Sequence, residues 1–398
     1  MIHILLSLYT LLQAASPGTT AANFLKIPVG ARPVGLGTAY TALADDVHSL
    51  EYNPSGLALL RQKEMALAHN QYAQGIVQEY LSYAHPLNSL GVLGLSLNSL
   101  RTKDIEAYDA SDQPRGTVSA SDMAMGIAWA RTIFTTQDTP LSWIENCSVG
   151  AQIRYISERL AEVKGQGWAM DMGTTLKTRF YGMKLGASLL QTGTRLKLER
   201  EAFPIASIFR LGWAWESVID PHYRLVMGAD GIFPQDNNPY PALGMELWVW
   251  ETLALRLGYR AKQDLGSGLS LGTGFKILHW EINYAFTDWD SFSNIHRIEV
   301  LWRFGHESPP PGRADSAGAE RLFRKHLDKG QYYLEKGAGE KAALEFERAL
   351  ELQPENPAAQ RLLKNTQNLF KIYPSTPPPT LPLIPPPADD LLEEEEIR

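Results

Sequence analysis

Residues 267–304 read SGLSLGTGFKILHWEINYAFTDWDSFSNIHRIEVLWRF. Three segments of this stretch carry apolar side chains at alternate positions: Leu269, Leu271, Phe275 and Ile277; then Trp280, Ile282, Tyr284 and Phe286; then Ile298, Val300, Trp302 and Phe304. Glycine, lysine, glutamate, asparagine and arginine occupy most positions between them. Successive side chains of a strand point to opposite faces, so the stretch predicts three strands with one apolar face each. Aromatic residues opposite Gly, Lys and Glu favour a barrel that faces lipid, and a soluble sheet is the alternative.

Composition limits the other structural and functional classes to which the chain could belong. The chain has 398 residues, enough for a large domain and an appendage. It contains no run of eighteen apolar residues, which excludes a transmembrane helix. A net charge of −7 argues against a nucleic-acid partner, and a single cysteine, Cys147, rules out an internal disulfide and disfavours a Cys-based metal site. We therefore expect no cofactor, no metal and no enzymatic activity.

The N-terminus predicts export. Ile4 to Leu12 form a short apolar run, and small residues follow from Ala14. This pattern is typical of a secretory signal peptide, which we assign to residues 1–17, although no Lys or Arg precedes the apolar run. A buried first helix is the alternative.

Residues 18–62 are rich in glycine and turn signals. Gly35 and Gly37 are not a dinucleotide fingerprint, because no third glycine follows at the required spacing and no strand precedes them. Asp45 and Asp46 stand side by side without a histidine, cysteine or metal-ligand cluster, so catalysis is not predicted there.

The same region resembles a known family. The phrases are Gly18 to Gly37, Ala44-Asp45-Asp46 and Asn53-Pro54-Ser55-Gly56-Leu57-Ala58, and together they are similar to the opening of the PorV/PorQ family of FadL-like outer-membrane barrels. The resemblance covers about residues 18–304, and Ser55 stands where many relatives carry alanine. It implies that residues 18–62 are an N-terminal hatch packed inside the barrel. The motif residues of that hatch are Gly35, Gly37, Asp45, Asp46, Asn53, Pro54 and Gly56.

Alternation continues through residues 63–305 and predicts fourteen antiparallel strands, an even number as outer-membrane barrels require. The predicted strands are 64–73, 77–85, 91–100, 120–131, 147–158, 167–178, 183–192, 205–216, 222–232, 241–250, 252–260, 267–276, 278–287 and 296–304. Most connections at one end are short, and we assign that end to the periplasm. Those at the other end are longer, among them 101–119, 159–166 and 193–204. The connection 132–146 is long on the short side.

The polar faces of these strands carry charges of both signs, which predicts a lumen filled with paired charges. Gly268-Leu269-Ser270-Leu271-Gly272 matches the nucleophile elbow of hydrolases. That motif needs a strand followed by a turn and a helix, whereas the alternation here runs straight through it. Ser270 is therefore predicted to be a small residue that faces the lumen.

Beyond Phe304 the pattern changes. Prolines in residues 306–316 predict a linker, and residues 317–371 have helical periodicity. This segment resembles a tetratricopeptide repeat with a capping helix, on the spacing of Gly330, Tyr333, Ala342, Phe346, Ala349 and Pro354. Lys329 stands where leucine is usual. Residues 372–398 are proline-rich and acidic, which predicts a disordered tail in the periplasm.

Two functions follow from the resemblances. The PorV/PorQ resemblance implies a non-enzymatic component of envelope protein export, as in type IX secretion, with secreted proteins or export subunits bound through the helical repeat. The FadL-like resemblance implies passage of a hydrophobic small molecule through the outer membrane. Its contacts would be the apolar hatch residues Phe24, Leu25, Ile27 and Leu36. In both cases the outer face of the barrel contacts outer-membrane lipid.

Overall fold

The computed structural model describes residues 17–87, 90–135, 143–180, 182–220, 222–261, 266–289, 294–305, 316–353 and 356–372. The chain divides into two units, Met1–Gly312 and Arg313–Arg398, which we treat separately. Residues 1–16 of the predicted signal peptide, 306–315 of the predicted linker and 373–398 of the predicted tail lie outside the described residues, as does Pro354.

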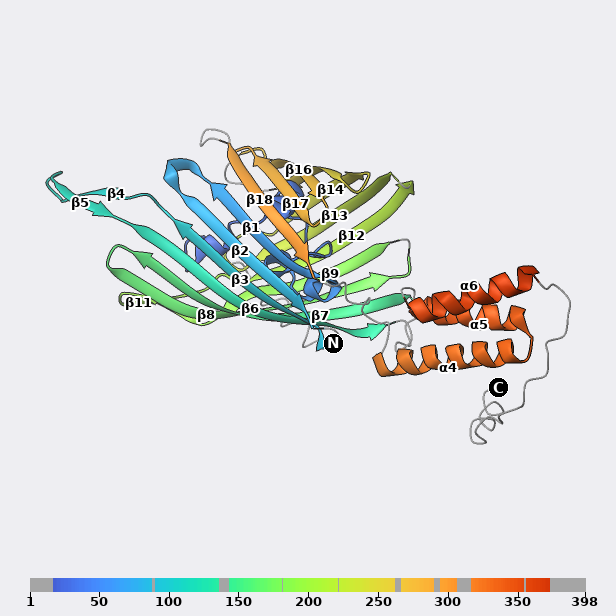
Figure 1. Cartoon of the computed structure of the whole chain (residues 1–398). Coiled ribbons are helices and arrows are strands. Elements are labelled where there is room, and N and C mark those ends of the chain that lie inside the picture. Colours follow the sequence, from blue (N-terminus) through green and yellow to red (C-terminus); the bar gives the residue numbers. More distant parts are fainter. Residues whose placement is uncertain are drawn as a thin grey trace. The chain divides into compact units, whose positions relative to one another are not determined.

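The first unit is a closed antiparallel barrel of fourteen strands (Figure 1). Each strand pairs with its neighbours along the chain, and the first strand closes the ring by pairing with the last. The strands are β1 Lys63–Gln71, β2 Val77–Pro86, β3 Val92–Arg101, β6 Ala120–Thr135, β7 Ile144–Leu160, β8 Val163–Thr178, β9 Met183–Gly193, β12 Ile208–Asp220, β13 Tyr223–Pro234, β14 Tyr240–Val249, β15 Leu253–Arg260, β16 Leu269–Ile277, β17 Trp280–Thr287 and β18 Ile295–Phe304. The predicted barrel and its strand number are confirmed.

One predicted connection was wrong, and two others contain short strands of their own. The loops at 101–119 and 193–204 contain hairpins, formed by β4 Ile105–Tyr108 with β5 Pro114–Val118 and by β10 Arg195–Leu198 with β11 Glu201–Pro204. Residues 159–166 are mostly strand, because β7 continues to Leu160 and β8 begins at Val163.

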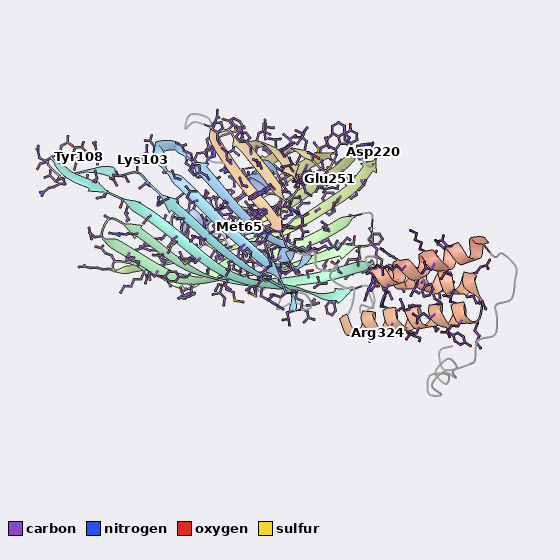
Figure 2. All side chains as sticks on the ribbon, viewed as in Figure 1. Met65, Lys103, Tyr108, Asp220, Glu251 and Arg324 are labelled. Carbon is purple, nitrogen blue, oxygen red and sulfur yellow. The ribbon has the colours of Figure 1, made fainter. Side chains whose placement is uncertain are left out.

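The outer face of the barrel is apolar. Side chains at alternate strand positions project outward (Figure 2), and many of them are large and exposed, for example Leu67, Ile127, Ile153, Trp168, Leu271 and Ile298. The inward positions between them are polar or small and buried. This is the arrangement that the alternation predicts for strands between lipid and a filled lumen.

The N-terminal segment fills that lumen, where Figure 1 shows it in dark blue. We call residues 18–62 the hatch. Its short elements are η1 Asn23–Lys26, α2 Ala31–Gly35, α3 Ser49–Tyr52 and η2 Pro54–Leu59, and a further turn, η3 Ala73–Gly75, joins β1 to β2. Helix α2 packs against β15 to β18, and η2 packs against β6, β7 and β8. Apolar hatch side chains such as Leu50 and Leu57 meet Ala84 and Ala128 of the wall.

The second unit consists of three helices, α4 Ser316–Glu335, α5 Gly339–Leu352 and α6 Pro357–Ile372. Helix α5 packs against both α4 and α6. Ala342, Phe346 and Ala349 are fully buried, and a Cβ on Gly330 would lie 2.4 Å from the ring of Phe346. Tyr333 is half-buried against Tyr332. These residues pack as the repeat spacing predicts, and the tetratricopeptide resemblance itself stays a prediction. In the described ranges no helix is long and apolar enough to cross a membrane.

Candidate functional site: the hatch and the cavity beside it

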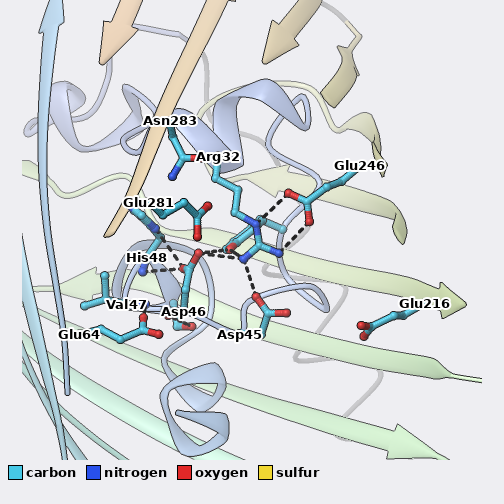
Figure 3. Close-up of polar contacts among 12 residues, drawn as sticks. Arg32, Asp45, Asp46, Val47, His48, Glu64, Glu216, Glu246, Glu281 and Asn283 are labelled. Atoms are coloured by element: carbon cyan, nitrogen blue, oxygen red, sulfur yellow. Dashed lines mark hydrogen bonds and ion pairs between the residues drawn. The ribbon is translucent and has the colours of Figure 1, made fainter. Parts of the chain in front are cut away.

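Arg32 joins the hatch to the barrel wall. Its Nε and Nη2 atoms donate to the two carboxylate oxygens of Glu246 on β14, each at 3.0 Å (Figure 3). Its Nη1 lies 2.6 Å from Asp45 and 2.9 Å from Asp46. Paired hydrogen bonds between a guanidinium and a carboxylate are among the strong polar contacts in proteins. The predicted motif residues Asp45 and Asp46 thus belong to a structural ion cluster. No sequence pattern indicated that Arg32 lies at its centre.

His48 forms a second link of the same kind. Its Nδ1 lies 3.0 Å from Asp46 and its Nε2 lies 2.8 Å from Glu299 on β18. Burial alone would lower the pKa of His48, but the carboxylates of Glu299 and Asp46 outweigh burial and hold that pKa well above its ordinary value. Burial alone would raise the pKa of Asp46, but His48 and Arg32 hold it well below its ordinary value. Both groups are therefore charged at neutral pH.

Gly35 and Gly37 mark the closest approach of the hatch to the wall. A Cβ on Gly35 would lie 3.1 Å from Cα of Gly272 on β16, and one on Gly37 would lie 2.5 Å from the backbone nitrogen of Tyr259 on β15. Gly37 also has φ of +62°. Only glycine meets both requirements without strain.

Asn53, Pro54 and Gly56 form the turn into η2. The side chain of Asn53 accepts a hydrogen bond from the backbone nitrogen of Ser55 at 3.2 Å and donates to Thr175 on β8 at 3.1 Å. Pro54 occupies the first position of η2, where its fixed φ suits a helix start. A Cβ on Gly56 would lie 2.2 Å from a backbone oxygen of the hatch. All seven predicted motif residues therefore serve to pack the hatch and hold it in place.

Charges elsewhere in the lumen are paired as well. The pairs are Arg154 with Glu51 and Asp171, Arg210 with Asp230, Arg256 with Glu246 and Glu281, and Arg303 with Glu64 and Glu281. Removing one partner of a buried ion pair leaves an uncompensated charge and is strongly destabilising. Of these pairs, the one between Arg154 and Glu51 joins the wall to the hatch, and the others lie within the wall.

A cavity of about 150 Å³ lies beside the hatch, at the end of the barrel that carries the longer connections. Its apolar lining comes from the hatch and from the wall strands β9, β12 and β14: Leu25, Ile27, Pro28, Leu190, Ile208 and Tyr240. The lining is also strongly polar: it includes an ion pair between Lys26 and Asp236 and the side chains of Arg210 and Arg260. A cavity of this volume is large enough for a single aromatic ring.

The wall is irregular beside this cavity. Pairing between β9 and β12 ends at Leu190 and Ile208, both of which line the cavity. The register between β8 and β9 shifts after Met170, and Gln191 of β9 has φ of +61°. The side chain of Gln191 donates to the backbone oxygen of Leu25 at 3.1 Å. The interruption of the wall is therefore tied directly to the hatch.

The four predicted ligand contacts divide into two groups. Leu25 and Ile27 line the cavity. Phe24 and Leu36 do not. Phe24 packs in a buried cluster with Leu25, and Leu36 is fully buried among hatch and wall residues. The wall residues of the cavity went unpredicted, and the one available signal was the break in alternation at Leu189-Leu190-Gln191.

Two other kinds of chemical site were considered, a hydrolase nucleophile and a metal centre. Ser270 lies within β16 and faces the lumen, as predicted, so the hydrolase-like motif is part of a regular strand. Among the described side chains no group of three His, Cys, Asp or Glu could hold a metal ion.

Comparison with known proteins gives a partial family match. A model described as "Uncharacterised protein family (UPF0164)" matches residues 10–154, which hold the hatch, strands β1 to β6 and the first part of β7. A relative from Treponema pallidum (strain Nichols), "UPF0164 protein", is 40% identical over 83 residues, 21% of this chain and 19% of the relative. The chain thus matches about a fifth of that relative's length.

Three solved structures share part of the chain path. The toluene transporter TodX of P. putida is 11% identical with a TM-score of 0.45, over 66% of this chain and 95% of that one. A FadL homologue of Pseudomonas aeruginosa is 9% identical with a TM-score of 0.44, over 70% and 98% of the two chains. Omp33 of Acinetobacter baumannii is 11% identical with a TM-score of 0.38, over 62% and 100%. The assignment of the barrel rests on the strand pairing described above, and the PorV/PorQ resemblance stays a prediction.

Proposed function

We propose that this protein is a non-enzymatic outer-membrane barrel through which a small hydrophobic molecule passes, bound on its way in the cavity beside the hatch. The observation that carries the proposal is the position of that cavity. Its apolar lining lies where the pairing of β9 with β12 ends, next to the register shift between β8 and β9.

The outer surface supports the membrane location. Leu257 of β15 and Leu271 of β16 are direct partners in the sheet, and both are about half exposed. An apolar surface that surrounds the barrel would promote aggregation in water and is favourable in lipid. We place the short turns and the C-terminal unit in the periplasm, so that the cavity lies at the external end.

The route follows from the packing of the hatch. Movement straight through the lumen would break the buried ion pairs of Arg32 with Glu246 and of Glu51 with Arg154. Movement sideways at Gln191 would open one hydrogen bond to the hatch, between its side chain and Leu25. Breaking one neutral hydrogen bond costs far less than separating a buried ion pair, so lateral release into the membrane is the favoured route.

The test is to fill the cavity. Ile27→Trp adds an aromatic ring to the cavity lining, whereas Ile282→Trp adds the same ring to the exposed outer face of β17 and serves as the matched control. Both variants are reconstituted into liposomes, and the entry of a toluene-sized probe into the liposomes is measured. Binding of the same probe to the detergent-solubilised protein is measured in parallel. Loss of both binding and entry in Ile27→Trp alone supports the proposal. Unchanged entry in a folded Ile27→Trp barrel contradicts it.

A second candidate is an adaptor in protein export of the type IX kind. The observation that favours it is the helical unit, where Tyr332 and Leu344 are large apolar side chains left about half exposed. Such helical hairpins are common interaction modules. A pull-down from solubilised outer membrane compares the full chain with one truncated after Phe304. Recovery of export subunits or secreted proteins by the full chain alone would favour the adaptor over the channel.

A further inference from the structure

A second and smaller cavity of about 30 Å³ lies between the hatch and the wall. Thr38 lines it from the hatch, Ser270 from β16 and Arg297 from β18, and its other polar side chains include Arg260, Thr287 and Asp288. It lies between the turn that follows α2 and the wall strands β15 to β18, which α2 contacts. No function discussed above uses it.

Three polar atoms of the lining are buried without a hydrogen-bond partner among the described residues: Thr38 Oγ1, Ser270 Oγ and Arg297 Nε. Each residue is at most 4% exposed. The other two nitrogens of the Arg297 guanidinium donate to Thr287 at 2.7 Å and to Tyr72 at 3.3 Å. Because a buried polar group without a partner is costly, three of them around one cavity indicate an occupant.

The chemistry of these atoms restricts that occupant. The Nε of arginine can only donate a hydrogen bond, and the hydroxyl groups of Thr38 and Ser270 can both donate. A species that accepts three hydrogen bonds satisfies all three atoms. A cation cannot accept the hydrogen bond that Arg297 Nε donates. Arg297 donates its hydrogen bonds to neutral hydroxyl groups, which do not compensate its positive charge.

The balance of charge then separates an anion from water. Arg297 brings a positive charge to the lining, and its hydrogen-bond partners Thr287 and Tyr72 are neutral. Charges interact more strongly in the poorly screened interior of a protein than in bulk water. An occupant with a single negative charge therefore compensates the site, and a neutral water molecule does not.

We propose that this cavity binds one small monovalent anion of the size of chloride, held between Thr38, Ser270 and Arg297. Its volume accommodates a water-sized species and is too small for an organic ligand, in contrast to the larger cavity beside the hatch. The anion would tie the segment after α2 to β16 and β18. The proposal does not depend on the passage of a hydrophobic molecule.

The first experiment locates the ion. Crystals of the full chain are grown with bromide in place of chloride, and anomalous scattering is measured at the bromine edge. An anomalous peak within hydrogen-bond distance of Arg297 Nε and the two hydroxyl groups supports the proposal. Density for water alone at this position overturns it.

The second experiment tests the hydroxyl donors. Ser270→Ala removes a hydroxyl that makes no other hydrogen bond to the described chain, and Ser82→Ala removes an equally buried, unpartnered hydroxyl on β2, away from this cavity. Hydrogen exchange of the hatch is followed in bromide and in sulfate at equal ionic strength. We expect saturable protection by bromide, with about tenfold weaker apparent affinity in Ser270→Ala and no change in Ser82→Ala. Equal protection in both salts, or an equal loss in both variants, would refute the site.

Discussion

At the scale of single residues, the hatch is held by a few side chains that each serve several partners. Arg32 contacts Glu246, Asp45 and Asp46 at once, and His48 lies between Asp46 and Glu299. Burying charge is costly, and the cost is recovered only when every charge is paired with good geometry. Such a network specifies one position of the hatch rather than a general attraction to the wall.

Replacing Arg32 tests this specification. Arg32→Ala leaves Glu246, Asp45 and Asp46 without their shared partner, so we expect a loss of about 3–5 kcal/mol in the stability of the hatch. This loss is measured from the dependence of amide hydrogen exchange in the hatch on denaturant concentration. The control is Arg115→Ala, which removes an exposed ion pair with Asp109 on the β4–β5 hairpin and should have little effect, because exposed ion pairs contribute little to stability. Equal effects of the two variants would show that the Arg32 cluster does not hold the hatch.

His48 predicts a dependence on pH with a definite sign. Its pKa is raised in the folded protein, so its stabilising effect is complete below its ordinary value of about 6.5 and is lost as the pH rises through the raised value. Asp46 has the opposite dependence, because its lowered pKa makes its contribution disappear only in acid. We therefore expect protection of the hatch to weaken above about pH 6.5, by up to about 1.4 kcal/mol per pH unit. His48→Gln should abolish this slope, and an unchanged slope in that variant would assign it to another group.

At the scale of elements, the sequence predicts the strands well and the contacts between them poorly. All fourteen barrel strands were found because a lipid-facing side chain alternates with a lumen-facing one, as at Leu269 to Ile277. The hairpins β4–β5 and β10–β11 lack that alternation, since they lie outside the region where lipid selects apolar residues. Partners such as Arg32 and Glu246 are 214 residues apart and meet only when the barrel closes. The cavity depends on a local register shift at β9, which no periodic pattern records.

The close approach of the hatch to β15 gives a prediction at this scale. Gly37→Ala places a methyl group 2.5 Å from the backbone of Tyr259 at φ of +62°, so the hatch must move or strain the wall. Gly18→Ala is the control, because Gly18 has φ of +83° but no atom within 4 Å of the added Cβ. The control should lose about 1 kcal/mol from backbone conformation alone, and Gly37→Ala should lose clearly more. Limited proteolysis of the hatch in both variants compares them, and equal cleavage would mean that the contact with Tyr259 is not restrictive.

At the scale of the whole molecule, the barrel and the helical unit have different sources of stability. The barrel closes on itself through the pairing of β1 with β18, and its outer apolar surface needs lipid. The helical unit buries a small core that includes Phe323, Ala349 and Ala359. The requirement for lipid is therefore specific to the barrel, and it can be tested on the outer face alone.

Leu271 provides that test. It is 54% exposed on β16 and pairs with Leu257, so Leu271→Arg places a charge among outward apolar side chains while the lumen is unchanged. We expect insertion into bilayers to become less favourable by about 2–4 kcal/mol, the range for arginine near the membrane centre. The control is Thr117→Arg, which places the same charge at an exposed position of the β4–β5 hairpin, outside the barrel sheet, and should leave insertion unchanged. Folding yield in liposomes, read from heat-modifiable migration, measures both variants. If Leu271→Arg inserts as well as the unaltered chain, the outer face of β16 does not contact lipid, and the barrel must be covered by protein there.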